Sequence, residues 1–164
     1  WALHEDFNLG SASVPVLVVD VNGDGLNDLI VGNAHNYGLY WLEQRRTADG
    51  TRAWVRHEID PDCSQYHDMH WVDIDGDGQC ELVTGQRYRA HCGNDPGEWG
   101  PVGTYYFKWN GESFTKQVID FGPRPAGKGL GIHFAMADLT GNGLPDIVAP
   151  GKDGLYIFYN EGFK

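Results

Sequence analysis

The residues with the clearest chemistry are acidic side chains at positions 1, 3, 5 and 9 of a nine-residue segment, D-I-D-G-D-G-Q-C-E, from Asp73 to Glu81. Oxygen atoms at alternate positions suit a hard cation such as Ca²⁺, which takes about 6–8 oxygen ligands, and the glycine at position 6 permits a sharp turn. An apolar, strand-like segment follows at 82–84, which disfavours a helix-loop-helix calcium site. We therefore expect a calcium loop with the ligands Asp73, Asp75, Asp77 and Glu81.

The same pattern occurs twice more, as D-V-N-G-D-G-L-N-D from position 20 and as D-L-T-G-N-G-L-P-D from position 138. In the third copy Thr140 and Asn142 stand where the second copy has acids, so that only two carboxylates remain. Calcium affinity should therefore fall from the second loop to the first and then to the third. The expected ligands in these two loops are Asp20, Asn22, Asp24, Asp28, Asp138, Asn142 and Asp146.

Short segments typical of strands surround each loop and define an internal repeat. Each loop is preceded by an apolar segment (14–19, 69–72 and 134–137) and followed by another (29–31, 82–84 and 147–149). An aromatic-rich segment comes next (38–42, 103–109 and 154–158). A fourth segment begins 19 residues before the first two loops, at Trp1 and Trp54, and 24 before the third, at Phe114. Apolar, β-branched and aromatic residues in such short runs predict four strands per repeat.

Four antiparallel strands per repeat, without helical periodicity, predict an all-β fold made of β-propeller blades. We expect one segment, 1–164, with repeats at approximately 1–53, 54–113 and 114–164. Residues 1–7 are expected to form the last strand of a preceding blade, and the third repeat ends after its third strand. Because closed propellers have about 4–8 blades, the three repeats should belong to a larger propeller. The alternative is that a second chain completes the ring.

The three loops and their flanking strands resemble FG-GAP or VCBS repeats. In that family the repeats are blades of a propeller, often of seven blades, and the loop between the first two strands binds calcium on one rim. The chain also resembles, more distantly, the propeller of aldos-2-ulose dehydratase, which eliminates water from keto-sugars. The segments H-D-M-H-W and R-Y-R-A-H-C-G-N-D-P-G-E look like those of related secreted propellers. This second resemblance implies an elimination reaction on a sugar.

The composition of the 164 residues limits the partners. A formal net charge of −11 disfavours binding to nucleic acid or to an anionic membrane surface, and no apolar run is long enough to span a bilayer. Calcium loops of this kind work where calcium is abundant, so we expect a secreted or periplasmic protein. Cys63 and Cys92 are expected on the same rim and could form a disulfide, while Cys80 stays a small buried residue. The alternative is three unpaired, buried thiols.

A second group of polar side chains is expected on the rim opposite the calcium loops, where first strands begin and second strands end. Strand alternation places His70 and His133 on the same side of the innermost strands, so they should face one pocket. The connection 87–100 is the longest of its type and is expected to form a lid or wall. The residues expected at this rim are His35, His67, His70, Arg87, Tyr88, Arg89, His91, Asp95, Trp99, His133 and Lys152.

Three function classes remain open. The first is a binding module for carbohydrate or another small polar ligand, with His35, His67, Arg89, Asp95 and Trp99 as ligand-binding residues. The second is an enzyme, a carbon–oxygen lyase acting as a sugar dehydratase or polysaccharide lyase. Its catalytic residues would be His70, His91, His133, Tyr88, Arg87 and Lys152, with Zn²⁺ or Mg²⁺ as a second metal. The third is a structural or protein-interaction propeller, in which the histidines are ordinary polar rim residues.

Overall fold

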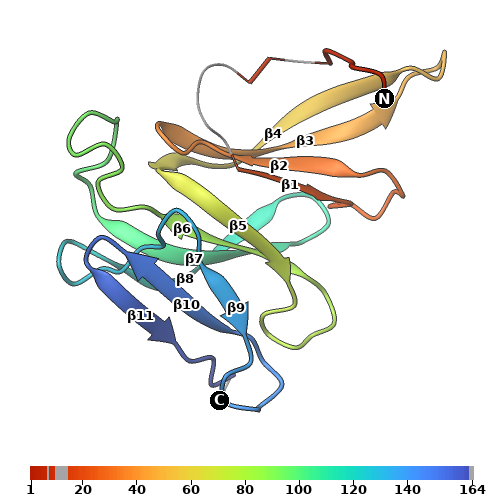
Figure 1. Cartoon of the computed structure of the whole chain (residues 1–164). Coiled ribbons are helices and arrows are strands. Elements are labelled where there is room, and N and C mark those ends of the chain that lie inside the picture. The colour runs from red at the N-terminus through yellow and green to blue at the C-terminus, as the bar shows by residue number, and fades with distance from the viewer. Residues whose placement is uncertain (7, 10–14, 163–164) are drawn as a thin grey trace.

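The computed structural model describes residues 1–6, 8–9 and 15–162, and their regular structure consists of strands (Figure 1). The first sheet contains β1 (Val16–Val19), β2 (Asp28–Gly32), β3 (Tyr37–Arg46) and β4 (Arg52–Ser64). The second contains β5 (Tyr66–Val72), β6 (Glu81–Gln86), β7 (Val102–Trp109) and β8 (Phe114–Gly122). The third contains β9 (Ala135–Ala137), β10 (Asp146–Gly151) and β11 (Gly154–Phe158).

Each sheet is antiparallel, and its strands lie in the order in which the chain makes them. In Figure 1 the three sheets follow one another from the top of the view to the bottom, and β5 lies next to β1 and β2. The first two sheets have four strands and the third has three. The predicted all-β fold of propeller-type blades is confirmed. No helix that could span a membrane is found in the described part of the chain.

The core lies between successive sheets, and β6 shows why its residues form a continuous apolar run. Neighbouring residues of a strand point to opposite faces. Leu82 packs with Ile30 and Trp41 of the first sheet, whereas Val83 packs with Ile147 of the third. Both faces of β6 are therefore covered, and all six of its residues are buried. Because β6 lies between two other sheets, both of its ends are fixed, and so are the points where the loop before it and the loop after it are attached.

The three aspartate-rich loops each connect the first two strands of a sheet and therefore lie at corresponding ends of the sheets. They are called the first loop (20–28), the second loop (73–81) and the third loop (138–146). The turn in each depends on glycine; Gly78, for example, has a φ of +88°, a conformation that glycine adopts without strain. The opposite ends of the sheets carry the β2–β3 turn, the segment 87–101 between β6 and β7, here called the long loop, and the β10–β11 turn.

The strands predicted from the sequence are present, with two corrections. β4 and β8 continue to Ser64 and Gly122, well beyond the predicted segments, while the predicted strand start at Val14 lies outside the described residues. The strand expected at 1–7 is wrong: residues 1–6 form no strand, and Phe7 is not among the described residues. A strand needs backbone partners, and Asp6 instead binds the outer strand β4 through its side chain, accepting hydrogen bonds from Arg52 and Trp54.

The third sheet ends at β11, as the sequence pattern predicts, and its outer edge has no neighbouring strand among the described residues. The sheets are offset from the sequence repeats by one strand, because β4 and β8 complete the first and second sheets and at the same time begin the repeats predicted at 54–113 and 114–164. The exact repeat boundaries stay a prediction.

Candidate functional site

The first aspartate of each loop holds the turn together through backbone N–H groups. The Oδ1 atom of Asp73 accepts hydrogen bonds from the N–H of Gly76 at 2.7 Å and of Asp77 at 3.2 Å, and its Oδ2 atom accepts one from Gly78 at 2.9 Å. Asp20 and Asp138 make the same three bonds in their own loops. The N–H bond from Gly143 is the main cause that lowers the pKa of Asp138. These carboxylates shape the loops directly.

The acid at position 9 ties its loop to the third strand of the sheet. Asp28 is fully buried; its Oδ2 accepts the N–H of Val21 at 3.0 Å and its Oδ1 accepts the N–H of Gln44 at 2.8 Å. Asp146 makes the equivalent pair of bonds, to Leu139 and Asn160. Burial raises the pKa of Asp28, although both N–H bonds oppose that shift. Both oxygens of Asp28 and of Asp146 are thus already engaged in structural hydrogen bonds.

The second loop differs, because it brings three carboxylates close together. Asp73, Asp75 and Glu81 each offer an oxygen, and these atoms lie within 4.8 Å of one another. The Oδ1 atom of Asp75 is buried and has no hydrogen-bond partner. Such an arrangement suits a hard cation. The first and third loops form no comparable three-residue group in the part of the chain that the structure describes.

Lys108 on β7 places its ammonium group among the same carboxylates. It binds Asp75 Oδ2, lies 2.8 Å from Asp77 Oδ2 and 3.6 Å from Glu81 Oε1. These contacts raise the pKa of Lys108 and lower that of Asp77, while burial raises the pKa of Glu81. Sequence reasoning missed Lys108, because only the strand register, in which Leu82 pairs with Phe107, brings the next residue to the loop.

On the opposite rim, a cavity of about 350 Å³ lies between the long loop and the β10–β11 turn; it is called the rim cavity. Four of the predicted residues line it, namely Arg87, Tyr88, His133 and Lys152. The ammonium of Lys152 donates hydrogen bonds to the carbonyl oxygens of Arg89 at 2.6 Å and Ala90 at 3.2 Å. Among the described residues no carboxylate lies within ion-pair distance of Arg87 or Lys152. Asp153 also lines the cavity, but its carboxylate lies 3.9 Å from the ammonium of Lys128, so the wall keeps a net positive charge.

Two further guanidinium groups lie beside this wall. That of Arg124 stacks on the ring of Tyr88, and that of Arg89 lies 4.4 Å from the ring centre of Trp99. The Nε and Nη2 atoms of Arg124 and the Nε atom of Arg89 are buried without a hydrogen-bond partner. Burial also lowers the pKa of Arg124. Arg124 comes from the glycine-rich segment 122–131, and no sequence signal pointed to it.

His70 and His133 are near each other, as strand alternation predicts, and Asp68 links them. Asp68 Oδ2 lies 3.6 Å from Nδ1 of His133 and 3.9 Å from Nε2 of His70, and it accepts the N–H of Phe134. His70 also contacts the carbonyl oxygen of Phe134 at 3.2 Å. His133 lines the rim cavity with a largely exposed side chain, whereas His70 does not line it. Asp68 was missed from the sequence.

The pocket predicted to hold His70, His91 and His133 together is not formed. The long loop carries His91 away from His133 and toward the β2–β3 turn, where its ring stacks on that of His35 with the centroids 4.3 Å apart. Both imidazoles contact the carboxylate of Asp95. His67 lies edge-on to His35 and accepts a hydrogen bond from Arg87; burial, followed by the charge of Arg87, lowers the pKa of His67 to about 4.

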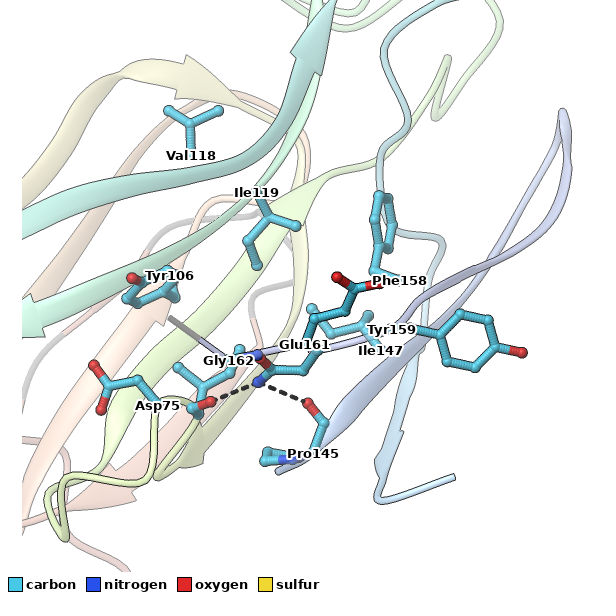
Figure 2. Close-up of a pocket in the computed structure, with 12 residues that line it drawn as sticks. Asp75, Tyr106, Val118, Ile119, Pro145, Ile147, Phe158, Tyr159, Glu161 and Gly162 are labelled. Atoms are coloured by element: carbon cyan, nitrogen blue, oxygen red, sulfur yellow. Dashed lines mark hydrogen bonds between the residues drawn. The ribbon is translucent and has the colours of Figure 1, made fainter. Parts of the chain in front are cut away.

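A second hollow, of about 280 Å³, lies between the second and third sheets at the end that carries the aspartate-rich loops. Figure 2 shows Tyr106, Ile119 and Phe158 around it. The amide nitrogen of Asn160 donates hydrogen bonds to the carbonyl oxygens of Ile74 at 2.6 Å and Pro145 at 3.3 Å. Most of its lining is apolar and continuous with the core between the two sheets. This hollow therefore offers few groups that could orient a polar ligand.

The cysteines are free thiols. Cys63 and Cys92 contact different lysines, with Cys63 Sγ 3.2 Å from the ammonium of Lys116 and Cys92 Sγ 3.6 Å from that of Lys152. Of the two alternatives left open by the sequence, the structure has the unpaired thiols, but they are not buried: Cys63 is half-buried and Cys92 is exposed. The expectation that Cys80 is buried is wrong; it is exposed, because it precedes the buried Glu81 and strand alternation turns it to the other side.

Comparison with known proteins gives one family match. Residues 20–84 match the model of the FG-GAP-like repeat, a segment that contains the first and second loops and the strands from β2 to the middle of β6. No curated protein matches the chain. Together with the three antiparallel sheets, this match supports a propeller-type segment with a structural or interaction role.

Proposed function

We propose that this propeller-type segment binds an acidic carbohydrate in the rim cavity. The observation that carries the proposal is that Arg87 and Lys152 line the cavity without an ion-pair partner among the described residues, in a chain whose net charge is −11. A carboxylate-bearing sugar, such as a uronate, complements that charge, whereas a neutral sugar does not. The guanidinium groups of Arg124 and Arg89, stacked on Tyr88 and Trp99, add positive charge close to the same wall.

The bonds already made by the two cations leave donors for a ligand. Lys152 has three N–H groups; two carbonyl oxygens accept from it, and the third partner is Cys92 Sγ at 3.6 Å, a weak acceptor that a carboxylate would replace. Arg87 uses Nη1 toward His67 and Nη2 toward Ala90 and has five N–H groups in all. Neutral acceptors thus fix both side chains in place while the charges stay available. A carboxylate in the rim cavity would receive charge-assisted hydrogen bonds, which are about twice as strong as neutral ones.

Binding is tested by calorimetric titration of the whole chain with uronate oligosaccharides and with neutral oligosaccharides of equal length. The variant Lys152→Ala should weaken uronate binding by about tenfold or more, because a charged hydrogen-bond donor is lost. The matched control is Arg46→Ala, an exposed cation at the far end of β3 that has no ion pair among the described residues. Equal affinities for the two sugar classes, or equal losses in the two variants, would contradict the proposal.

A lyase is a second candidate, favoured by the contact between His133 and Asp68. The carboxylate beside Nδ1 can hold the imidazole with Nε2 available as a base. That base would take the proton next to the sugar carboxylate, the C–H electron pair would form a C=C bond, and the neighbouring C–O bond would break with its electron pair on oxygen. The protonated imidazole would then return the proton to this leaving oxygen. Lys152 and Arg87 would stabilise the intermediate charge. Appearance of the ultraviolet absorbance of an unsaturated uronate, lost in His133→Ala, would establish this activity.

We also propose that the second loop binds Ca²⁺ through Asp73, Asp75 and Glu81, with Asp77 beside them. The unpartnered buried oxygen of Asp75 supports this choice over the other two loops, whose position-9 acids are already satisfied. Calcium there would supply positive charge to a cluster of carboxylates. A calcium site of millimolar affinity is occupied only where calcium is abundant, so a secreted or periplasmic location belongs to the same proposal.

A further inference from the structure

We propose that His35, His91 and Asp95 form a binding site for a divalent transition-metal ion, with Zn²⁺ the best match. Nδ1 of His35 lies 3.0 Å from Asp95 Oδ2, and Nδ1 of His91 lies 3.1 Å from Asp95 Oδ1. Ligand atoms of the three residues fall within 4.8 Å of one another. This site is distinct from the second loop, because nitrogen atoms contribute two of its three ligands.

The distances between the ligand atoms suit a tetrahedral ion. Zinc binds nitrogen and oxygen at about 2.0–2.1 Å, so two ligands of a tetrahedral site are separated by about 3.3 Å. The two observed separations between nitrogen and oxygen are slightly shorter, and a small outward movement of the rings would admit the ion. Imidazole nitrogens favour zinc over calcium and magnesium, which take oxygen ligands.

The three side chains come from connections of two different sheets, and further hydrogen bonds hold two of these residues in position. His35 lies in the β2–β3 turn, where its N–H contacts Asn33 Oδ1 at 3.4 Å. Asp95 lies in the long loop, and its N–H donates to the carboxylate of the buried Glu98. The Asp95 side chain is only 10% exposed. An ion bound here would fasten the long loop, which forms one wall of the rim cavity, to the first sheet.

The third nearby histidine is not a ligand. Nε2 of His67 accepts a hydrogen bond from Arg87 at 3.2 Å, and the positive charge of that guanidinium opposes an ion on that side. The site thus has three protein ligands, and a tetrahedral ion would keep one position for water or for a ligand atom. The competing explanation is that the two imidazoles simply donate hydrogen bonds to Asp95. Metal titration distinguishes a metal site from these simple hydrogen bonds.

The experiment uses the whole chain with saturating calcium, which keeps added metal out of the aspartate-rich loops. Zn²⁺ is titrated by calorimetry and Co²⁺ by visible absorption. The wild-type chain should bind one ion, and the cobalt spectrum should lack the intense sulfur charge-transfer band. His35→Ala and His91→Ala should each weaken zinc binding by about 100-fold or more, above the range for losing an outer partner of a metal ligand.

Three further variants keep the result interpretable. His57→Ala is the matched control, because His57 contacts Glu43 on the outer part of the first sheet; its zinc affinity should equal that of the wild type. Cys92→Ser tests the thiol next to His91 and should also leave zinc binding unchanged. Asp95→Asn keeps the size of the side chain and should lose zinc while its circular dichroism stays unchanged. Absence of binding, unaltered binding in His35→Ala, or loss in Cys92→Ser would overturn the site.

Discussion

At the scale of single residues, Lys108 distinguishes the second loop from the other two. The residues in the equivalent register positions are Glu43, in the first sheet, and Tyr159, in the third, so neither of those loops has an ammonium group of its own. Carboxylates that would repel one another are compensated by Lys108. A calcium ion must displace this charge or share the loop with it.

Removal of Lys108 should therefore strengthen calcium binding. Lys108→Met keeps the aliphatic chain and removes a positive charge that lies within 4 Å of three carboxylates. We expect calcium affinity to rise by about tenfold or more, measured by calorimetry. Lys116→Met removes the same charge from β8, where it faces Asp60, and should not change calcium affinity. A weaker calcium affinity in Lys108→Met would show that this lysine helps to build the site.

A physical difference separates the site residues that could be recognised in the sequence from those that could not. Spacing within one loop is local, so the acids at Asp73, Asp75 and Glu81 could be recognised directly. The register of neighbouring strands or the packing of neighbouring sheets brings three other residues to their sites, namely Lys108, Asp68 and Arg124. The spacing of residues along the sequence does not reveal register or packing. The positions of these three residues follow only from the three-dimensional structure.

At the scale of elements, the regular strands made the positions of His70 and His133 predictable, whereas the irregular long loop left the position of His91 unpredictable. The period of two places His70 and His133 on one side of the inner strands, and Asp68 lies between them. The long loop has no such period. Arg89 and Cys92 adopt positive φ angles of 46° and 59°, which turn the chain and direct His91 toward the first sheet.

The outer strands of the first two sheets are linked by a buried carboxylate, which makes stability depend on pH. Asp60 on β4 accepts a hydrogen bond from Tyr66 at 2.7 Å and pairs with Lys116 of β8. Burial raises the pKa of Asp60, but the bonds from Lys116 and Tyr66 outweigh it, so the pKa lies below its usual value. The contribution of Asp60 to stability is therefore complete above the pKa of the unfolded chain and is lost on acidification through the folded pKa.

Asp60→Asn should lower the free energy of unfolding at neutral pH by about 3 kcal/mol, because it leaves Lys116 without its buried partner. Urea unfolding at neutral pH and below about pH 4 measures this. The difference between wild type and variant should shrink in acid. The control Asp62→Asn changes an exposed neighbour on the same strand and should have little effect. A difference that stays constant with pH would contradict the role of the charged carboxylate.

At the scale of the whole molecule, the order of the sheets was predictable because each aspartate-rich loop and the strand-like segments that follow it recur in the same order along the chain. The state of residues 1–6 was not, since a strand-like sequence forms a strand only beside a partner. The same reasoning applies at β11, whose open edge carries the exposed side chains of Leu155 and Ile157. Open edges pair readily with other strands. Further propeller blades or another copy of the chain could supply that partner.

The chain by itself should therefore associate through β11. Light scattering over a range of concentrations should show the apparent mass rising with concentration. Leu155→Lys puts a charge on the edge and should reduce association, whereas Leu139→Lys, an exposed position in the third loop, should not. A monomer at every concentration would argue that the edge is already protected.

A crystal structure of the chain with a uronate oligosaccharide and calcium would show whether the rim cavity binds an acidic sugar. The sugar carboxylate should lie within hydrogen-bond distance of the ammonium of Lys152 or the guanidinium of Arg87. Uronates can also coordinate calcium, so the second loop is the competing position. A sugar found only at that loop, or a rim cavity without sugar at saturating concentration, would contradict the account.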